Sequence, residues 1–279
     1  MITRRRFLRA SAVTSGAGLG LGLYTWRWEP HWVEIVERRL PLARLPERLQ
    51  GARLVHLSDL HIGPRVADSY LIQAFMRVKE FNPEIVVYTG DFISYNADVF
   101  AHADRMFSHL PLGSRATFGI LGNHDYGPAW AHLDVASRVA ESAKSVGVRM
   151  LRNEMAEVDG LQVAGLDDLW ARRFDPVRAL AALDPLKASL VLSHNPDTVD
   201  QQGWGGYTGW ILAGHTHGGQ CKPPFLPAPL LPVRNRQYTS GEFTLSGGRR
   251  MYINRGVGHL LRVRFNARPE ITVFHLERA

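Results

Sequence analysis

Residues 54–61 read Leu-Val-His-Leu-Ser-Asp-Leu-His, and this stretch decides the fold. A short, mainly apolar run that ends at Ser58, Asp59 and His61 is typical of a buried strand followed by a polar loop. Ligands bind at the carboxyl ends of the strands in open α/β sheets, so such segments predict one polar rim. Four more segments repeat the pattern after apolar runs: Thr89-Gly90-Asp91, Gly122-Asn123-His124-Asp125, Ser193-His194-Asn195 and Gly214-His215-Thr216-His217.

Apolar runs of strand length alternate with longer amphipathic stretches after residue 30. This alternation, with a strand-rich final third, predicts an α/β fold, a layered α/β sandwich with mixed central sheets. The expected strands are 32–40, 54–58, 85–89, 117–121, 148–151, 161–165, 190–193, 210–213, 251–254 and 271–275. The expected helices are 67–81, 98–109, 131–146 and 176–183.

The residue types in the five polar segments point to metal binding. Imidazoles, carboxylates and a carboxamide suit divalent Mn, Fe or Zn. Asp59 and His61 are two residues apart, as are His215 and His217, and this spacing allows both members of a pair to face one ion. The segments offer too many ligands for one tetrahedral ion but fit two ions that share a carboxylate. Two such ions can bind the attacking and leaving oxygens of a phosphoryl transfer.

The series D-x-H, G-D, G-N-H-D, H and G-H-x-H, from Leu54 to His217, resembles the calcineurin-like metallophosphoesterase superfamily. Asn254-Arg255-Gly256-Val257-Gly258 is a further similar segment. The resemblance implies the calcineurin-like metallophosphoesterase fold and two divalent ions. It also implies a role for each matching residue: Asp59, His61 and His217 on the first metal, Asn123, His194 and His215 on the second, Asp91 as the bridge and His124 as the proton donor.

The resemblance further implies hydrolysis by in-line attack of a metal-bound hydroxide, with His124 protonating the leaving group. The protein Ser/Thr phosphatases of the superfamily extend the second motif to GDxxDRG, whereas residues 90–95 read Gly-Asp-Phe-Ile-Ser-Tyr. This departure favours a phosphodiesterase or pyrophosphatase. Some relatives hydrolyse UDP-2,3-diacylglucosamine in lipid A synthesis. Asp125 either orients His124 or a neighbouring backbone group, or is a surface or helix-capping residue.

Residues 1–26 are expected to form a twin-arginine-type signal or a membrane anchor, and residues 27–279 the metallophosphoesterase domain. Residues 3–9 read Thr-Arg-Arg-Arg-Phe-Leu-Arg, and a Gly-, Ala- and Ser-rich apolar stretch follows. This order resembles a twin-arginine signal, which implies the twin-arginine export machinery as a partner. The segment is either cleaved or retained as a membrane anchor. Trp26, Trp28 and Trp32 then lie near the membrane interface, or else pack on the first strand.

The signal predicts a bacterial cell-envelope protein, periplasmic or membrane-associated. The alternative is an uncleaved anchor with the domain on the cytoplasmic face. UDP-2,3-diacylglucosamine is made on the cytoplasmic side, so a periplasmic domain requires another envelope phosphodiester as its substrate.

The formal net charge of +7 is concentrated at the amino terminus. Arg4, Arg5, Arg6 and Arg9 contribute four of the seven charges, and the remaining 29 Lys and Arg exceed the 26 acids by three. A mildly basic body does not indicate nucleic-acid binding. The single Cys221 excludes an internal disulfide. We expect a monomer.

Five prolines interrupt the segment Gly218–Tyr238, which therefore cannot form a regular helix. Its apolar residues are expected either to bind an apolar substrate or the bilayer, or to pack on the body: Phe225, Leu226, Leu230 and Leu231. Arg65, Arg234 and Arg255 are candidates to pair with substrate phosphate, because guanidinium groups bind phosphate in a bidentate manner.

Two other functions compete with an envelope metallophosphodiesterase. A phosphomonoesterase or nuclease could use the same metal centre. The missing GDxxDRG motif and the net charge of only +3 outside the four amino-terminal arginines disfavour both. A catalytically inactive metal- or lipid-binding protein is the second alternative, and the complete set of ligand positions disfavours it.

Overall fold

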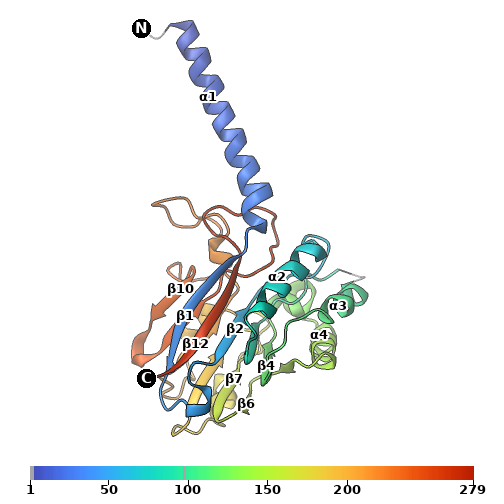
Figure 1. Cartoon of the computed structure of the whole chain (residues 1–279), viewed down its shortest axis with the longest axis vertical. Coiled ribbons are helices and arrows are strands. Elements are labelled where there is room, and N and C mark those ends of the chain that lie inside the picture. The colour runs from blue at the N-terminus through green and yellow to red at the C-terminus, as the bar shows by residue number, and fades with distance from the viewer. Residues whose placement is uncertain (1–2, 97–98) are drawn as a thin grey trace.

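The computed structural model describes residues 3–96 and 99–279, and within them two six-stranded mixed sheets lie face to face (Figure 1). The order of the first sheet is β1 (Glu34–Leu42), β12 (Glu270–Arg278), β2 (Arg53–Leu57), β3 (Ile85–Thr89), β4 (Ala116–Ile120) and β5 (Arg149–Met150). The order of the second is β10 (Gly241–Thr244), β11 (Arg250–Ile253), β9 (Trp210–Ala213), β8 (Ala188–Leu192), β7 (Leu161–Gly165) and β6 (Glu154–Val158).

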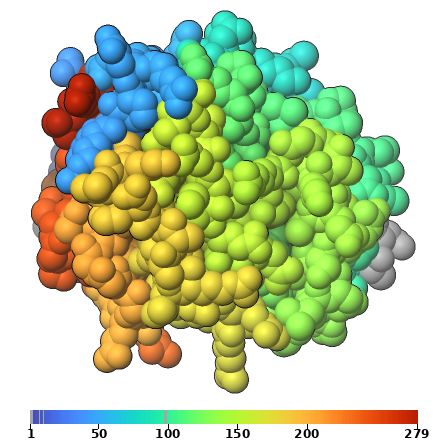
Figure 2. All heavy atoms as spheres, turned by 90° about the horizontal axis from the view of Figure 1, so that it is seen from below, coloured from blue at the N-terminus to red at the C-terminus, as the bar shows by residue number. Residues whose placement is uncertain are grey.

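Parallel strands form the centre of each sheet. β2 to β5 run parallel in the first sheet, and β7, β8, β9 and β11 run parallel in the second. The antiparallel pairs are β12 with β2, and the edge strands β6 and β10 with their neighbours. The parallel strands of a sheet therefore end at one edge, which is where the polar segments lie. Figure 2 views the opposite end of the molecule, where segments from most of the chain form one rounded surface.

The main core lies between the two sheets. Because side chains alternate along a strand, Ile85 and Val87 of β3 face the second sheet, while Val86 and Tyr88 face the helices on the other side. All four are buried. Strands that are apolar on both faces are typical of a sheet covered on both sides, and this is the reason that β3 reads as a continuous apolar run.

Helices cover the outer faces of the sheets. α2 (Asp68–Glu80), α3 (Val99–Phe107) and α4 (Leu133–Ser145) pack on the first sheet, and the short α5 (Pro176–Leu180) packs on the second (Figure 1). Leu71, Phe75 and Val78 occur at helical spacing and form the buried stripe of α2.

The amino-terminal helix α1 (Arg4–Leu23) projects from the body (Figure 1). The chain then continues through a π-helical turn at Tyr24–Trp28 and a 3₁₀ turn at Glu29–His31. These turns are bound to the body, because the backbone N–H of Arg264 donates to the carbonyl of Thr25 at 2.9 Å, and that of Ala267 donates to the Glu29 carboxylate at 2.7 Å. Of the helices in the described ranges, none is both long enough and apolar enough to traverse a bilayer.

The predicted layered α/β fold is confirmed, and most differences concern the ends of elements. The edge strands β6 and β10 were not expected, because both are short, β10 alternates half-buried and exposed positions, and β6 has no continuous apolar run. The helix expected from residue 131 begins at Leu133, since Ala129 and Trp130 adopt left-handed backbone conformations. The start expected at Asp98 lies outside the described residues, and α3 is described from Val99.

Truncating a side chain between the sheets should cost far more stability than truncating an exposed one. Leu212 of β9 is fully buried in the inter-sheet core, so Leu212→Ala should lower the free energy of unfolding by roughly 2–5 kcal/mol. Leu186, which is exposed in the loop before β8, is the control, and Leu186→Ala should change stability by less than about 0.5 kcal/mol. Urea unfolding measures both values. Equal losses would contradict this account of the core.

Candidate metal centre

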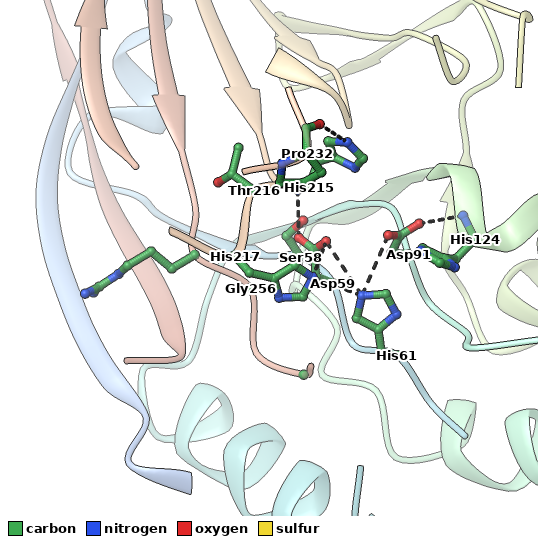
Figure 3. Close-up of polar contacts among 12 residues, drawn as sticks. Ser58, Asp59, His61, Asp91, His124, His215, Thr216, His217, Pro232 and Gly256 are labelled. Atoms are coloured by element: carbon green, nitrogen blue, oxygen red, sulfur yellow. Dashed lines mark hydrogen bonds and ion pairs between the residues drawn. The ribbon is translucent and has the colours of Figure 1, made fainter. Parts of the chain in front are cut away.

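The five polar segments meet at the carboxyl ends of strands from both sheets, and Figure 3 labels residues of all of them except Ser193-His194-Asn195. The first sheet supplies three loops, which follow β2, β3 and β4. The second sheet supplies two, which follow β8 and β9. The residues that these loops bring together are Asp59 and His61, Asp91, Asn123 and His124, His194, and His215 and His217.

The first ligand group consists of Asp59, His61 and His217, all buried. Nε2 of His61 lies 3.1 Å from Nε2 of His217, and the two rings are stacked. Oδ1 of Asp59 lies 3.4 Å from Nε2 of His217 and 4.0 Å from Nε2 of His61. Two nitrogens and one oxygen thus converge on one small volume.

The second ligand group consists of Asp91, His194 and His215, also buried. Nε2 of His194 lies 3.2 Å from Oδ2 of Asp91 and 3.1 Å from Nδ1 of His215. Oδ1 of Asn123 lies 3.2 Å from the same His194 nitrogen. The expected carboxamide is therefore part of this group.

Asp91 connects the two groups. Its Oδ2, which is 3.2 Å from His194, also lies 3.7 Å from Nε2 of His61 in the first group. Its Oδ1 accepts a hydrogen bond of 2.9 Å from the backbone N–H of His124. This bond fixes the carboxylate so that Oδ2 faces both groups.

Backbone carbonyls determine which ring nitrogen of His194 and of His215 is available to bind a metal ion. Nδ1 of His194 lies 2.7 Å from the carbonyl of Thr89, and Nε2 of His215 lies 2.9 Å from the carbonyl of Pro232. A carbonyl only accepts, so those two nitrogens carry the protons. The other nitrogen of each ring points into the second group, where it could bind an ion. Such partners orient metal-binding histidines in general.

Burial keeps most of the imidazoles neutral. It lowers the pKa of His61 and of His215 to about 3, and lowers the pKa of His217 well below its ordinary value. Burial also lowers the pKa of His194, but attraction to Asp91 outweighs it and raises that pKa to about 10. A divalent cation at this position would take the place of that proton.

Five of the candidate ligands occupy strained backbone positions. Asp59, His61, Asp91, His215 and His217 all have φ between 50° and 70°, a region that few residues other than glycine adopt. The chain turns sharply as it leaves each strand, and this turn directs the side chain back over the end of the sheet. Strain of this kind is concentrated at functional sites.

The donor set fits divalent transition metals. Oδ1 of Asp59 and Nδ2 of Asn123 are buried and have no hydrogen-bond partner among the described residues. A buried carboxylate oxygen without a partner is costly unless a cation binds it. Together with four imidazoles and a second carboxylate, it suits Mn, Fe or Zn.

His124 lies at the edge of the centre and is half-buried. Its ring meets the ring of His61 edge to face, with centroids 5.2 Å apart. Asp125 accepts hydrogen bonds from the backbone N–H groups of Gly122 and Ile93, so its carboxylate orients backbone groups.

Two of the three arginines considered for phosphate binding have other partners. Arg255 forms ion pairs with Glu34 at 2.8 Å and with Glu270 at 2.5 Å. Arg65 donates to the carbonyl of Leu260 at 2.8 Å. Arg234 is exposed, and its guanidinium forms no ion pair within the described ranges.

The proline-rich segment does lie beside the centre, since the carbonyl that orients His215 belongs to Pro232. Phe225, Leu226 and Leu230 are exposed, whereas Leu231 is buried. The segment therefore divides into a residue that packs on the body and three that face outward.

Sequence reasoning missed two features of the site. Arg264 is fully buried, donates to the carbonyls of Gly258 (2.6 Å) and Ala267 (2.9 Å), and lies 3.3 Å from Nδ1 of His217. A lone arginine in a loop carries no signal of this role.

The other missed feature is the loop after β7, where Asp168 is buried and the Trp170 ring meets the His215 ring at 4.4 Å. That loop has the same pattern as the other five, polar residues directly after an apolar strand. The pattern therefore could have found it.

Comparison with known proteins agrees with this geometry. Residues 52–219 match the family of calcineurin-like phosphoesterases. The chain belongs to this family, whose members are metal-dependent phosphoester hydrolases.

Individual relatives extend over nearly the whole chain. It is 34% identical to the phosphodiesterase YaeI of Escherichia coli, over 99% of this chain and 100% of YaeI. It is 32% identical to YkuE of Bacillus subtilis, an uncharacterised metallophosphoesterase, over 99% of this chain and 98% of YkuE. It is 27% identical to the UDP-2,3-diacylglucosamine pyrophosphatase LpxG of Chlamydia trachomatis, over 91% of this chain and 93% of LpxG. The resemblance inferred from the motifs is therefore confirmed.

Metal binding should depend on the space left by Gly256. A Cβ at this position, where φ is +71°, would lie 2.7 Å from Cβ of Asp59 (Figure 3). Gly256→Ala should therefore displace Asp59 and lower the metal content per chain, measured by plasma mass spectrometry. Gly241 has a similar φ of +86° with open space around it, so Gly241→Ala controls for backbone strain alone. Equal metal content in the two variants would refute the prediction.

Proposed function

We propose that this protein is a dinuclear-metal-dependent phosphodiesterase or pyrophosphatase of the bacterial cell envelope. The observation that carries the proposal is the position of Oδ2 of Asp91, within 3.7 Å of a ligand nitrogen of each group. One carboxylate oxygen placed between two sets of buried ligands fits a bridging role. When bound, two divalent ions activate a water molecule and neutralise the charge that develops on the phosphate oxygens.

Side chains and backbone groups hold the reacting groups in position. Asp59, His61 and His217 would bind one ion, and Asn123, His194 and His215 the other, with Asp91 between them. The backbone N–H of His124 keeps Asp91 turned toward both groups. Rigid ligands on strained loops need little reorganisation during the reaction, which favours electrostatic stabilisation of the transition state.

His124 is proposed to protonate the leaving oxygen. Its ring lies next to His61 at the edge of the centre and remains half-exposed, so it can reach a bound substrate. General acid catalysis requires a proton donor within hydrogen-bond reach of the leaving group.

The proposed substrate is a lipid-linked phosphodiester or pyrophosphate, with UDP-2,3-diacylglucosamine as one candidate. The missing GDxxDRG motif and the similarity to YaeI, named a phosphodiesterase, and to LpxG, named a pyrophosphatase, support this class. The basic residues at the start of α1, followed by its apolar stretch, support an envelope location through export or anchoring. On the periplasmic side the substrate would be another envelope phosphodiester.

Hydrolysis of bis-p-nitrophenyl phosphate tests the reaction class. The purified chain should release p-nitrophenol in the presence of Mn²⁺ and lose this activity when a chelator removes the metal. Readdition of Mn²⁺ should restore it. Absence of metal-dependent turnover would reject the enzymatic function.

Replacing His124 should affect catalysis without affecting metal binding. His124→Ala should lower kcat by roughly 10²- to 10⁴-fold, the usual contribution of a general acid. His132 is the control, because it is exposed at the start of α4 and caps no backbone group with its side chain. Metal content should match the unsubstituted chain in both variants. Loss of metal from His124→Ala would contradict the proposed role.

A further inference from the structure

Exposed apolar side chains gather at the end of the molecule from which α1 projects. Figure 1 shows the loops before β10 and before β12 around the base of α1. These loops and the turns after α1 expose large apolar side chains: Trp26, Trp28, Phe225, Leu226, Leu230, Leu261 and Val263. Large exposed apolar side chains that gather in one region are typical of an interaction site. We call the set of seven residues the apical face.

Hydrogen bonds join the three segments of the apical face into one surface. The backbone of Arg264 donates to Thr25, as described above, which ties the turns after α1 to the loop before β12. The backbone N–H of Lys222 donates to the carbonyl of Phe265 at 2.8 Å, and the Gln220 side chain donates to the carbonyl of Leu261 at 2.7 Å. The three segments are therefore joined to one another at these points.

The segments that build the apical face carry positive charge and almost no negative charge. Residues 1–28, 201–241 and 243–269 contain no Asp or Glu. The nearest acid to the first segment, Glu29, is buried and accepts a hydrogen bond from the backbone of Ala267. The basic residues in the loops and turns of the face include Arg27, Lys222, Arg234, Arg236 and Arg262. A face that combines exposed apolar side chains with cations is complementary to a partner that is apolar in its interior and anionic at its surface.

The apical face lies beside the metal centre. Pro232, whose carbonyl orients His215, follows the exposed Leu230 by two residues. Arg264, which contacts His217, follows the exposed Val263 directly. The loops that expose the apolar residues are thus the same loops that support ligands of both groups.

We propose that the apical face docks onto a lipid bilayer with anionic headgroups. The apolar side chains enter the headgroup region, where Trp in particular is favoured, and the cations pair with the anionic lipids. A second copy of the chain is a poorer occupant, because a two-fold contact through this face would bring like charges together. Docking would present the metal centre to a phosphate ester that is still embedded in the membrane, and this part of the proposal rests on the proposed function.

Local fluorescence in the full chain tests docking without relying on catalysis. In a Cys221→Ser background, Leu226→Cys provides one attachment point for an environment-sensitive dye, and Leu186→Cys, before β8, provides a matched exposed control. Vesicles containing phosphatidylglycerol should shift the dye emission at position 226 to the blue, and pure phosphatidylcholine vesicles should shift it much less. Position 186 should not respond. No shift at 226, or equal shifts at both positions, would overturn the proposal.

A second measurement links docking to substrate use. Replacing Phe225, Leu226 and Leu230 by Ser should lower hydrolysis of a vesicle-embedded lipid phosphodiester, relative to that of soluble bis-p-nitrophenyl phosphate, by about tenfold or more. Leu186→Ser should leave this ratio unchanged. An unchanged ratio in the triple variant would contradict docking as the route to substrate. A blue shift at position 226 without turnover of either substrate would support docking and reject the proposed enzymatic function.

Discussion

Oδ2 of Asp91 lies 3.7 Å from Nε2 of His61 and 3.2 Å from Nε2 of His194, two imidazoles that come from different sheets. This contact requires the carboxyl ends of β2, β3 and β8 to meet at one point. The two sheets must therefore pack face to face with their parallel strands ending at the same edge. The inter-sheet core provides this alignment, since its buried side chains come from the same strands that carry the ligands.

Forming the centre costs free energy through backbone strain and desolvation, and this cost is distributed over the loops that follow the strands. Five ligands occupy left-handed backbone conformations, and the buried carboxyl of Asp59 has a pKa that burial raises to about 6. Bound cations would offset that desolvation, whereas the close packing of Gly256 and the carbonyls beside His194 and His215 hold the geometry before any ion binds. The geometry of the centre is thus preorganised by backbone carbonyls and by Gly256, where a larger residue would displace Asp59.

Much of the fold and of the site could be predicted from the sequence because both depend on local patterns. Apolar runs such as 85–89 marked the buried strands, and the polar residues directly after them marked the ligands. The edge strand Gly241–Thr244 was missed because half-exposed strands carry a weak pattern. The burial of Arg264 beside His217 depends on packing between distant segments, which no local pattern encodes. The loop that carries Trp170 did have the local pattern, but its contact with His215 required the structure.

The exposed apical face and the buried centre share their loops, so the proposed docking and the proposed catalysis would depend on the same part of the chain. The central claim is that two ions bind at the rim and share Asp91. Anomalous diffraction from crystals soaked in Mn²⁺ tests it most directly. The account predicts two peaks, one beside His61 and one beside His194, both contacting the Asp91 carboxylate. A single peak, or two peaks of which only one contacts Asp91, would contradict it.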